Sequence, residues 1–307
     1  MEMGHGHTHG HGTAGGAHRR PLQVVLGLTL ALLAAEVVGA AMSGSLALLA
    51  DAGHMATDAA GIALALAAVS LAQRPARGRR TFGWQRVEIL AAVANGLLLL
   101  AVAGYVLAAA VRRIGHPPEI DSGLMLGIAS VGLVVNLVSL GVLHRGRTDS
   151  LNVRGAYLEV LADAFGSVAV IVAAVVIALT GWTPADIVAS VLIGFLVVPR
   201  AWHLLREAFD VLLEAAPRGV DLDDVRRHMI GVDGVLDVHD LHAWTITSGL
   251  PVLSAHVVVT DEALAAGHGG RVLDALCSCL GEHFDLEHCT FQLEAGTHAD
   301  HEAPVHD

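Results

Sequence analysis

The sequence has few charged residues, few aromatic residues and little cysteine. Charged residues make up 16% of the 307 residues and aromatic residues 4%, whereas hydrophobic residues make up 54%. A soluble domain usually contains about 25% charged residues, so the composition argues against an ordinary soluble protein. Three cysteines, Cys277, Cys279 and Cys289, cannot build a disulfide scaffold, and we expect reduced thiols. Collagen, a coiled coil and a disordered tail are excluded as well.

The charge is distributed unevenly along the chain. Lysine is absent, and Met1 to Leu212 contain 14 arginines against 13 acidic residues. Leu213 to Asp307 contain only 4 arginines against 17 acidic residues. A near-neutral apolar part followed by a strongly acidic part predicts a membrane domain joined to an aqueous domain. The acidic part should attract cations and repel nucleic acid, so we expect no nucleic-acid partner.

Six apolar runs are long enough to cross a bilayer, which requires about 20 residues per helix. They predict an all-α membrane domain over residues 21–212, with helices at Leu22–Met42, Leu46–Leu71, Val87–Val111, Ser122–Leu143, Ala156–Leu179 and Pro184–Leu205. Residues 1–20 contain no apolar stretch of their own, so we expect no signal peptide there. Most arginines flanking these runs fall on one side, which predicts a multi-pass protein of the inner membrane with both termini in the cytoplasm.

The second and fifth runs contain pairs of ionisable residues that are costly inside a bilayer. His54 and Asp58 are four residues apart, as are Glu159 and Asp163. This spacing places each pair on one helix face. Four such groups would together cost on the order of 10 kcal/mol without a ligand. If the two faces meet, one imidazole and three carboxylates form a tetrahedral site for a divalent cation.

Simpler explanations of these polar residues remain open at this point. The two pairs could make contacts between helices or line a pore. Asp51 lies three residues before His54 and could either hold the metal ligands in position or line an entry path. Glu36, Asn95 and Asn136 are expected to form hydrogen bonds between helices, each contributing about 0.6–2 kcal/mol. The segment around His54 does not match the H-E-x-x-H pattern of zinc proteases.

Three sequence segments resemble the cation diffusion facilitator family, in its bacterial zinc, cadmium and cobalt efflux branch. They are Ser43–Asp58, which resembles helix 2 of the family, Arg79–Glu88, which resembles the start of helix 3, and Asn152–Asp163, which resembles helix 5. The resemblance implies a proton-coupled antiporter that exports divalent transition metal from the cytoplasm. It also implies a homodimer in which each chain has six helices and a cytosolic metal-binding domain.

The resemblance also assigns the transport site by position. His54, Asp58 and Asp163 match the ligands of the family, whereas the usual residue of this branch at Glu159 is histidine. Glutamate adds oxygen and negative charge to the site. Zn²⁺ is expected as the cargo, and Cd²⁺, Co²⁺ or Mn²⁺ become easier to accommodate.

The aqueous ends have different sequence patterns. Residues 1–20 contain histidines spaced mainly by glycine, which predicts a flexible metal-collecting tail. Residues 213–295 predict a small α+β domain of αββαβ order, which is ferredoxin-like, with helices at Leu222–Ile230 and Arg271–His283. Its strands are expected at Val235–Ile246, Val252–Val259 and Cys289–Glu294, with 247–251 joining the first two. Residues 296–307 are expected to be a flexible tail.

Histidines on the predicted strands suggest a second metal site. His239, His256, His288 and Glu294 are distributed so that neighbouring strands could bring them to one ion. His239 and His242, on the same strand, are expected on opposite faces. The resemblance favours His239 and His256 within this group, with His268 as a further candidate.

Three classes of function other than metal export are less consistent with the sequence. A membrane-anchored metal sensor or buffer would bind metal through the tail and the acidic domain, but would not need paired ligands inside helices. An exporter of organic cations would need an aromatic-lined cavity, and aromatic residues are scarce. We expect no enzyme, because the sequence contains no nucleophile–base arrangement and no cofactor-binding loop. The expected partners are divalent metal ions, protons, the lipid bilayer and a second copy of the chain.

Overall fold

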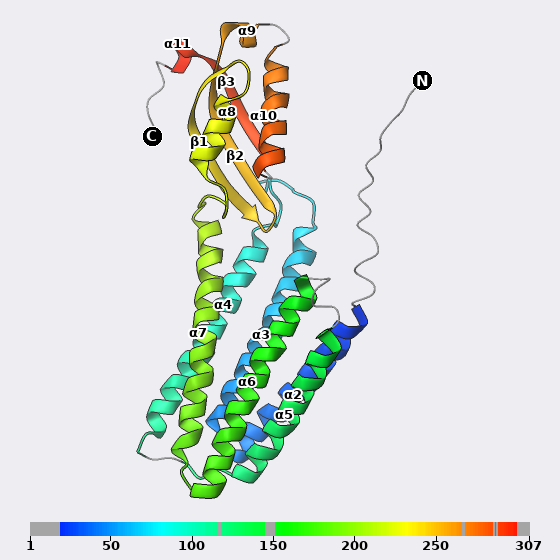
Figure 1. Ribbon diagram of the computed structural model, residues 1–307, viewed down its shortest axis with the longest axis vertical. Coiled ribbons are helices and arrows are strands. Elements are labelled where there is room, and N and C mark those ends of the chain that lie inside the picture. The colour runs from blue at the N-terminus through cyan, green and yellow to red at the C-terminus, as the bar shows by residue number, and fades with distance from the viewer. Residues whose placement is uncertain are drawn as a thin grey trace. The chain divides into compact units, whose positions relative to one another are not determined.

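The computed structural model describes residues 19–115, 118–144, 151–265, 268–284, 286 and 288–299, and within these it describes no side chains for 19–23, 151–152 and 299. Six long helices come first in the chain (Figure 1). They are α2 (Arg19–Ser43), α3 (Leu46–Ala72), α4 (Val87–Arg113), α5 (Ser122–Leu143), α6 (Leu151–Thr180) and α7 (Pro184–Leu212). Each is long and apolar enough to cross a membrane.

The described chain forms two compact units. The first contains the chain up to Ala63 together with Asn95–Trp202, and the second contains Leu64–Ala94 together with the chain from His203 onward. Helices α3, α4 and α7 therefore contribute residues to both units.

The first unit is a helical bundle in which α5 lies beside both α2 and α6 (Figure 1). Its main core consists largely of small and branched residues, such as Ala47 of α3, Ala129 of α5 and Ala174 of α6. Small side chains let helix backbones approach closely, which is how helices pack in a bilayer. Large apolar side chains such as Phe165 and Phe195 are exposed on the outside, as expected for helices surrounded by lipid.

A tight turn joins α2 to α3 and is fixed by a buried carboxylate. Gly44 adopts a φ of 71°, a left-handed conformation that glycine tolerates well. The Ser45 hydroxyl accepts a hydrogen bond from the Leu48 amide at 3.1 Å and so caps α3. Asp186 of α7 is fully buried and accepts hydrogen bonds from the Ser45 hydroxyl, at 2.5 Å, and the Leu46 amide, at 2.8 Å. The first turn of α3 is therefore anchored to α7.

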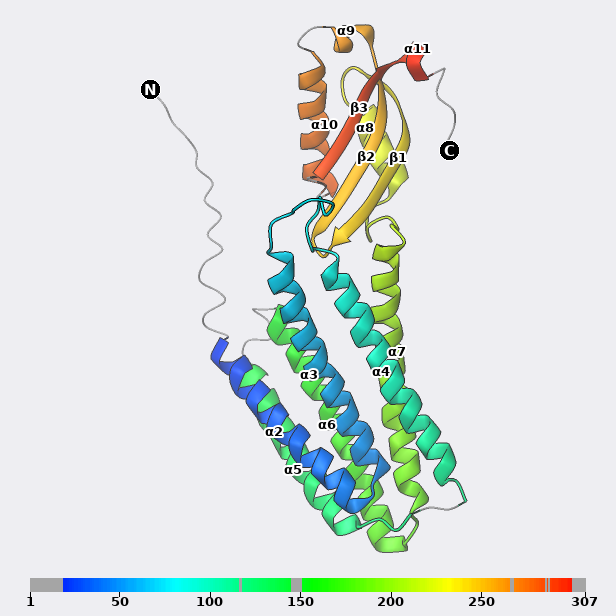
Figure 2. The same ribbon diagram turned by 180° about the vertical axis from the view of Figure 1, so that it is seen from behind.

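The C-terminal part of the second unit is a three-stranded sheet with helices on one face. Its elements are α8 (Leu222–Ile230), β1 (Val235–Thr247), β2 (Leu250–Val259), α9 (Asp261–Leu264), α10 (Gly269–Phe284), β3 (His288–Ala295) and α11 (Gly296–Ala299). The strand order is β1-β2-β3, with β1 antiparallel and β3 parallel to β2. Figures 1 and 2 show α8 and α10 on the same face, where Met229 and Leu280 pack against Leu253.

The predicted fold class is confirmed, and three local predictions were wrong. Residues 247–251 are not a five-residue loop, because β1 and β2 are joined by a turn at Ser248 and Gly249, and Pro251 pairs with Thr245 inside the sheet. Helix α9 was missed because it is only four residues long. Gly296–Ala299 form α11 and not a flexible tail.

Candidate metal-binding sites

The first candidate site lies within the helical bundle and contains three predicted ligands. Nε2 of His54 lies 3.5 Å from Oδ2 of Asp58 and 3.7 Å from Oδ1 of Asp163. One ligand atom from each residue lies within 4.8 Å of the other two. Because His54 and Asp58 are one turn apart on α3 and Asp163 comes from α6, the site joins two helices, as the spacing predicted.

The three side chains are shielded from solvent and have unused hydrogen-bonding capacity. Residue exposure is 8% for His54 and 5% for Asp163, and the Asp58 side chain is 12% exposed. Oδ1 of Asp163 and Nδ1 of His54 have no hydrogen-bond partner among the described residues. A buried polar atom without a partner is costly, so the arrangement favours binding of a cation.

Glu159, the fourth predicted ligand, is held by an arginine that the sequence analysis did not assign to the site. Nη2 of Arg200 donates to Oε1 of Glu159 at 2.7 Å, and Nη1 of the same guanidinium donates to Oδ2 of Asp58 at 3.3 Å. Glu159 is therefore near the group without being one of its three members. Arg200 lies near the end of the sixth predicted apolar run, Pro184–Leu205. Helix α7 continues to Leu212 and encloses it.

Further carboxyl groups are buried on α2 and α3. Glu36 is 1% exposed and Asp51 is 2% exposed. Both carboxyl groups pack closely against glycines, where a side chain would leave too little space. A Cβ at Gly132 would lie 3.3 Å from Oε1 of Glu36, and a Cβ at Gly166 would lie 2.8 Å from Oδ1 of Asp51. Oε2 of Glu36 has no hydrogen-bond partner among the described residues, whereas the predicted helix-to-helix contact of Asn136 is present, to Ser167 at 3.4 Å.

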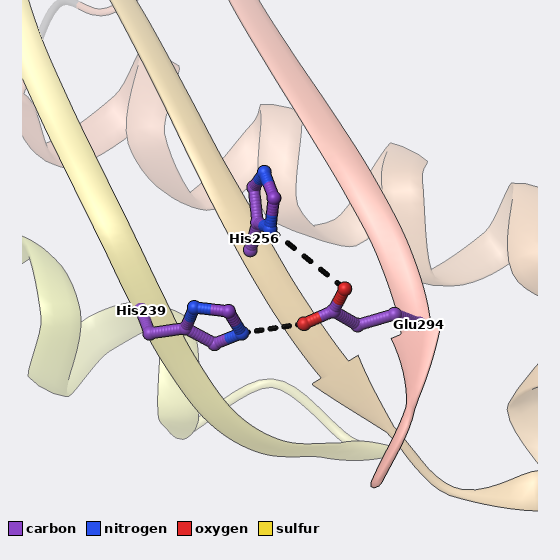
Figure 3. A group of neighbouring side chains, drawn as sticks. All are labelled: His239, His256 and Glu294. Carbon is purple, nitrogen blue, oxygen red and sulfur yellow. Dashed lines mark hydrogen bonds and ion pairs between the residues drawn. The ribbon is translucent and has the colours of Figure 1, made fainter. Parts of the chain in front are cut away.

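The second candidate site lies on the sheet face opposite α8 and α10 and combines three of the four predicted residues (Figure 3). Glu294 of β3 is 4% exposed and its carboxylate lies between two imidazoles. Oε1 is 2.5 Å from Nε2 of His239, and Oε2 is 3.7 Å from Nδ1 of His256. The strand pairing explains this arrangement, since His239 lies opposite His256 on the neighbouring strand.

His288, the fourth predicted residue, is not part of this group. It is exposed at the start of β3, where its ring makes an edge-on contact with Phe82, with 6.0 Å between the ring centroids. His268 is also elsewhere, with Nδ1 2.7 Å from the carbonyl oxygen of Glu262. The histidines of residues 1–18, like His301 and His306, lie outside the described residues.

The expectation that His239 and His242 face opposite sides of the sheet was wrong. His239 pairs with His256 and His242 pairs with Ser254. Two residues therefore lie between the histidines on β1, where only one residue lies between their partners on β2. This extra residue is a β-bulge, and Asp240 within it has a φ of 49°. The bulge turns both histidines to the same face. Oδ1 of Asp240 then lies 2.9 Å from Nε2 of His242.

Six membrane-length helices define a polytopic membrane protein, and the histidine and carboxylates buried among them could hold a cation. Comparison with known proteins identifies the family. Residues 22–213 match the cation efflux transmembrane domain, and residues 217–296 match the cation efflux protein cytoplasmic domain. The chain belongs to the cation efflux family, a family of transporters, and the resemblance inferred from the sequence is confirmed.

Individual relatives cover nearly the whole chain. The cation efflux system protein CzcD of Alcaligenes sp. (strain CT14) is 47% identical over 95% of this chain and 90% of that protein. The zinc transporter ZitB of Escherichia coli (strain K12) is 40% identical over 96% and 93% of the two chains. The cadmium, cobalt and zinc/H(+)-K(+) antiporter of Bacillus subtilis (strain 168) is 38% identical over 96% and 93%.

A solved structure also matches part of the chain. It is the metal-bound C-terminal domain of the CzcD transporter from Cuprividus metallidurans, which is 39% identical. The match covers 24% of this chain and 99% of that domain, with a TM-score of 0.22.

Proposed function

We propose that this protein exports divalent transition metal from the cytoplasm in exchange for protons, with Zn²⁺ as the main cargo and Cd²⁺ and Co²⁺ as alternatives. The observation that carries the proposal is the convergence of His54, Asp58 and Asp163 from two membrane-length helices. An imidazole nitrogen and two carboxylates suit a borderline dication such as Zn²⁺. Relatives named as zinc, cadmium and cobalt transporters support the same cargo class.

Proton exchange follows from competition for the same atoms. Imidazole and carboxylate groups bind metal only in their deprotonated forms, so loading releases protons and protonation releases metal. Exposure of the site to the cytoplasm would favour loading, and exposure to the other side would favour exchange for protons. Alternating exposure through movement of the helices would couple the two fluxes.

We assign residues 21–212 to the transporting domain and 213–295 to a cytoplasmic domain through which two copies associate. The match of 217–296 to the cytoplasmic domain of the family supports this placement. Both termini would then face the cytoplasm and the six helices would cross the inner membrane. The histidines of residues 1–18 would collect metal for transport.

Transport by purified protein in liposomes tests the proposal. Zn²⁺ added to one side should drive proton movement, and Asp163→Asn should abolish both fluxes. Asp121→Asn is a matched control, because Asp121 is exposed and caps α5 outside the site. Proton-coupled Zn²⁺ flux that persists at the natural rate in Asp163→Asn would show that the cargo binds elsewhere. Binding of Zn²⁺ without any flux in the natural chain would instead favour a sensor or buffer.

Glu159 sets the preference among metals in this proposal. A carboxylate oxygen in place of an imidazole nitrogen makes the site a harder ligand set. This should raise the binding of Co²⁺ and Mn²⁺ relative to that of Zn²⁺. Glu159→His should shift the ratio of Zn²⁺ to Co²⁺ or Mn²⁺ transport toward Zn²⁺. An unchanged ratio would mean that Glu159 does not contact the cargo.

We also propose a second metal site formed by His239, His256 and Glu294. The two imidazoles flank a buried carboxylate on the sheet face opposite the helices (Figure 3). Glu294→Gln removes the charge without changing the shape, and should eliminate one class of bound Zn²⁺ in equilibrium dialysis of the full chain. His288→Gln is the comparison variant. If His288→Gln also lost this class of bound Zn²⁺, His288 would have to move into the group as a fourth ligand.

A further inference from the structure

Arg200 is a cation of the helical bundle that directly contacts the candidate transport site. It extends from α7 and its two terminal nitrogens contact different residues, Oε1 of Glu159 at 2.7 Å and Oδ2 of Asp58 at 3.3 Å. The same Asp58 oxygen lies 3.5 Å from Nε2 of His54. One carboxylate oxygen thus belongs both to the candidate metal group and to an arginine pair.

The arginine pair gives the site a charge that does not depend on pH. A guanidinium stays protonated under all physiological conditions, and its planar fork suits two carboxylates. Without a cation, Asp58 and Glu159 would be like charges close together in a medium of low polarity, which is unfavourable. The Arg200 side chain is 46% exposed, whereas the side chains of Glu159 and Asp58 are 29% and 12% exposed. Arg200 therefore reaches the carboxylates from their more open side.

We propose that Arg200 is an internal counter-ion that occupies part of the empty transport site and is displaced when cargo metal binds. The inference rests on the proposed function, since it requires metal to bind at His54, Asp58 and Asp163. A dication on Oδ2 of Asp58 would sit beside the guanidinium that contacts this oxygen, and the two positive charges repel each other. Metal and Arg200 consequently compete for Asp58.

Displacement of Arg200 also explains the position of Glu159. In the structure Glu159 binds the guanidinium and is not one of the three-residue group. When Arg200 leaves, Glu159 loses its partner and becomes available as the fourth ligand. The exchange replaces one bridging cation by another, so Asp58 and Glu159 have a cationic partner both before and after metal binds.

The movement of Arg200 can be followed by chemical modification of arginine. The full-length protein in detergent is treated with phenylglyoxal, with and without Zn²⁺, and the modified arginines are located by mass spectrometry. Zn²⁺ should raise modification of Arg200 several-fold. Arg113 is the internal reference, because it contacts Asp186 and the Gly44 carbonyl in the same bundle and should be unaffected.

Binding measurements on variants complete the test. Arg200→Gln removes the competitor and should tighten Zn²⁺ binding about tenfold, which corresponds to ~1.4 kcal/mol. Arg86→Gln is the matched control, since Nη2 of Arg86 lies 2.9 Å from Oε1 of Glu214 and both residues belong to the other compact unit. If Zn²⁺ binds and Asp163→Asn abolishes that binding, yet Arg200 is modified equally with and without metal, the displacement is refuted and the transport site stands. If the natural chain binds no Zn²⁺ at these residues, both proposals fail.

Discussion

Asp186 should be among the most sensitive residues of the helical bundle. Its fully buried carboxylate accepts hydrogen bonds from Ser45, from Leu46 and, at 3.1 Å, from the Ala47 amide, and it lies 3.4 Å from Nη1 of Arg113. Asp186→Ala would leave these donors and the arginine without their acceptor. A hydrogen bond to a charged group contributes about 1.5–3 kcal/mol, and removing one partner of a buried ion pair costs about 3–5 kcal/mol. These contributions overlap, so we expect a loss of ~4 kcal/mol in unfolding free energy.

Thermal unfolding of the purified protein in detergent measures this loss. A change of ~4 kcal/mol should lower the Tm by roughly 10 °C in a bundle of this size. Asp186→Asn keeps one acceptor oxygen and should fall between the natural chain and Asp186→Ala. Asp121→Asn serves as the comparison, because Asp121 is an exposed cap and asparagine caps a helix about as well as aspartate, so this variant should lose little stability. If Asp186→Ala unfolded no earlier than Asp121→Asn, the carboxylate would not anchor α3.

Three further predictions concern the pH dependence of Zn²⁺ binding, the stability of a Glu36 variant and the reactivity of the cysteine thiols. Lowering the pH from 7.5 to 5.5 should weaken Zn²⁺ binding by about tenfold per pH unit for each proton released, as measured by titration calorimetry. Glu36→Gln removes a buried charge with an unpartnered oxygen and should keep the unfolding free energy within about 1 kcal/mol of the natural value, as thermal unfolding would show. Burial and the nearby Cys277 thiol raise the pKa of Cys289 to about 11, and burial with Glu282 raises the pKa of Cys279. A raised pKa leaves less thiolate near neutral pH, so N-ethylmaleimide should label the exposed Cys277 first, as peptide mapping would reveal.

The helices were predictable because their signal lies in neighbouring residues. Uninterrupted apolar runs placed Ser122–Leu143 at the bounds of α5, and an aspartate cap placed Leu222–Ile230 at those of α8. The largest error was at the end of α7, where polar residues after Leu205 suggested that the helix had ended. The helix continues to Leu212 because these residues leave the apolar environment without losing their helical hydrogen bonds.

The strand faces were less predictable, since they depend on the partner strand. Alternation along β1 would place His239 and His242 on opposite sides, and only the bulge at Asp240 reverses this. Asp240 gives no strong sequence signal, because aspartate adopts a positive φ less often than glycine does. A single extra residue changes the face of every later side chain in a strand.

The transport site shows the same division between local and distant information. Four-residue spacing identified His54 with Asp58 as one helix face, because i,i+4 neighbours always share a face. The contact of Asp58 with Arg200 joins residues 142 positions apart, and no periodicity predicts it. An arginine well inside an apolar helix is nevertheless a usable signal, since it needs a carboxylate partner there.

The balance of charge within the bundle gives a physical reason for cation transport. Five carboxylic acids, those of Glu36, Asp51, Asp58, Glu159 and Asp163, lie inside the helices, and Arg200 contacts only Asp58 and Glu159 among them. Their charge can be balanced by protons or by a metal ion, and exchange between these two states is the chemistry of an antiporter. A further arginine placed in the group would balance one more carboxylate and so reduce the need for protons or metal. Ile62→Arg, four residues and about one helical turn beyond Asp58 on α3, should therefore reduce both Zn²⁺ binding and proton release, and unchanged values of both would show that charge balance does not govern the site.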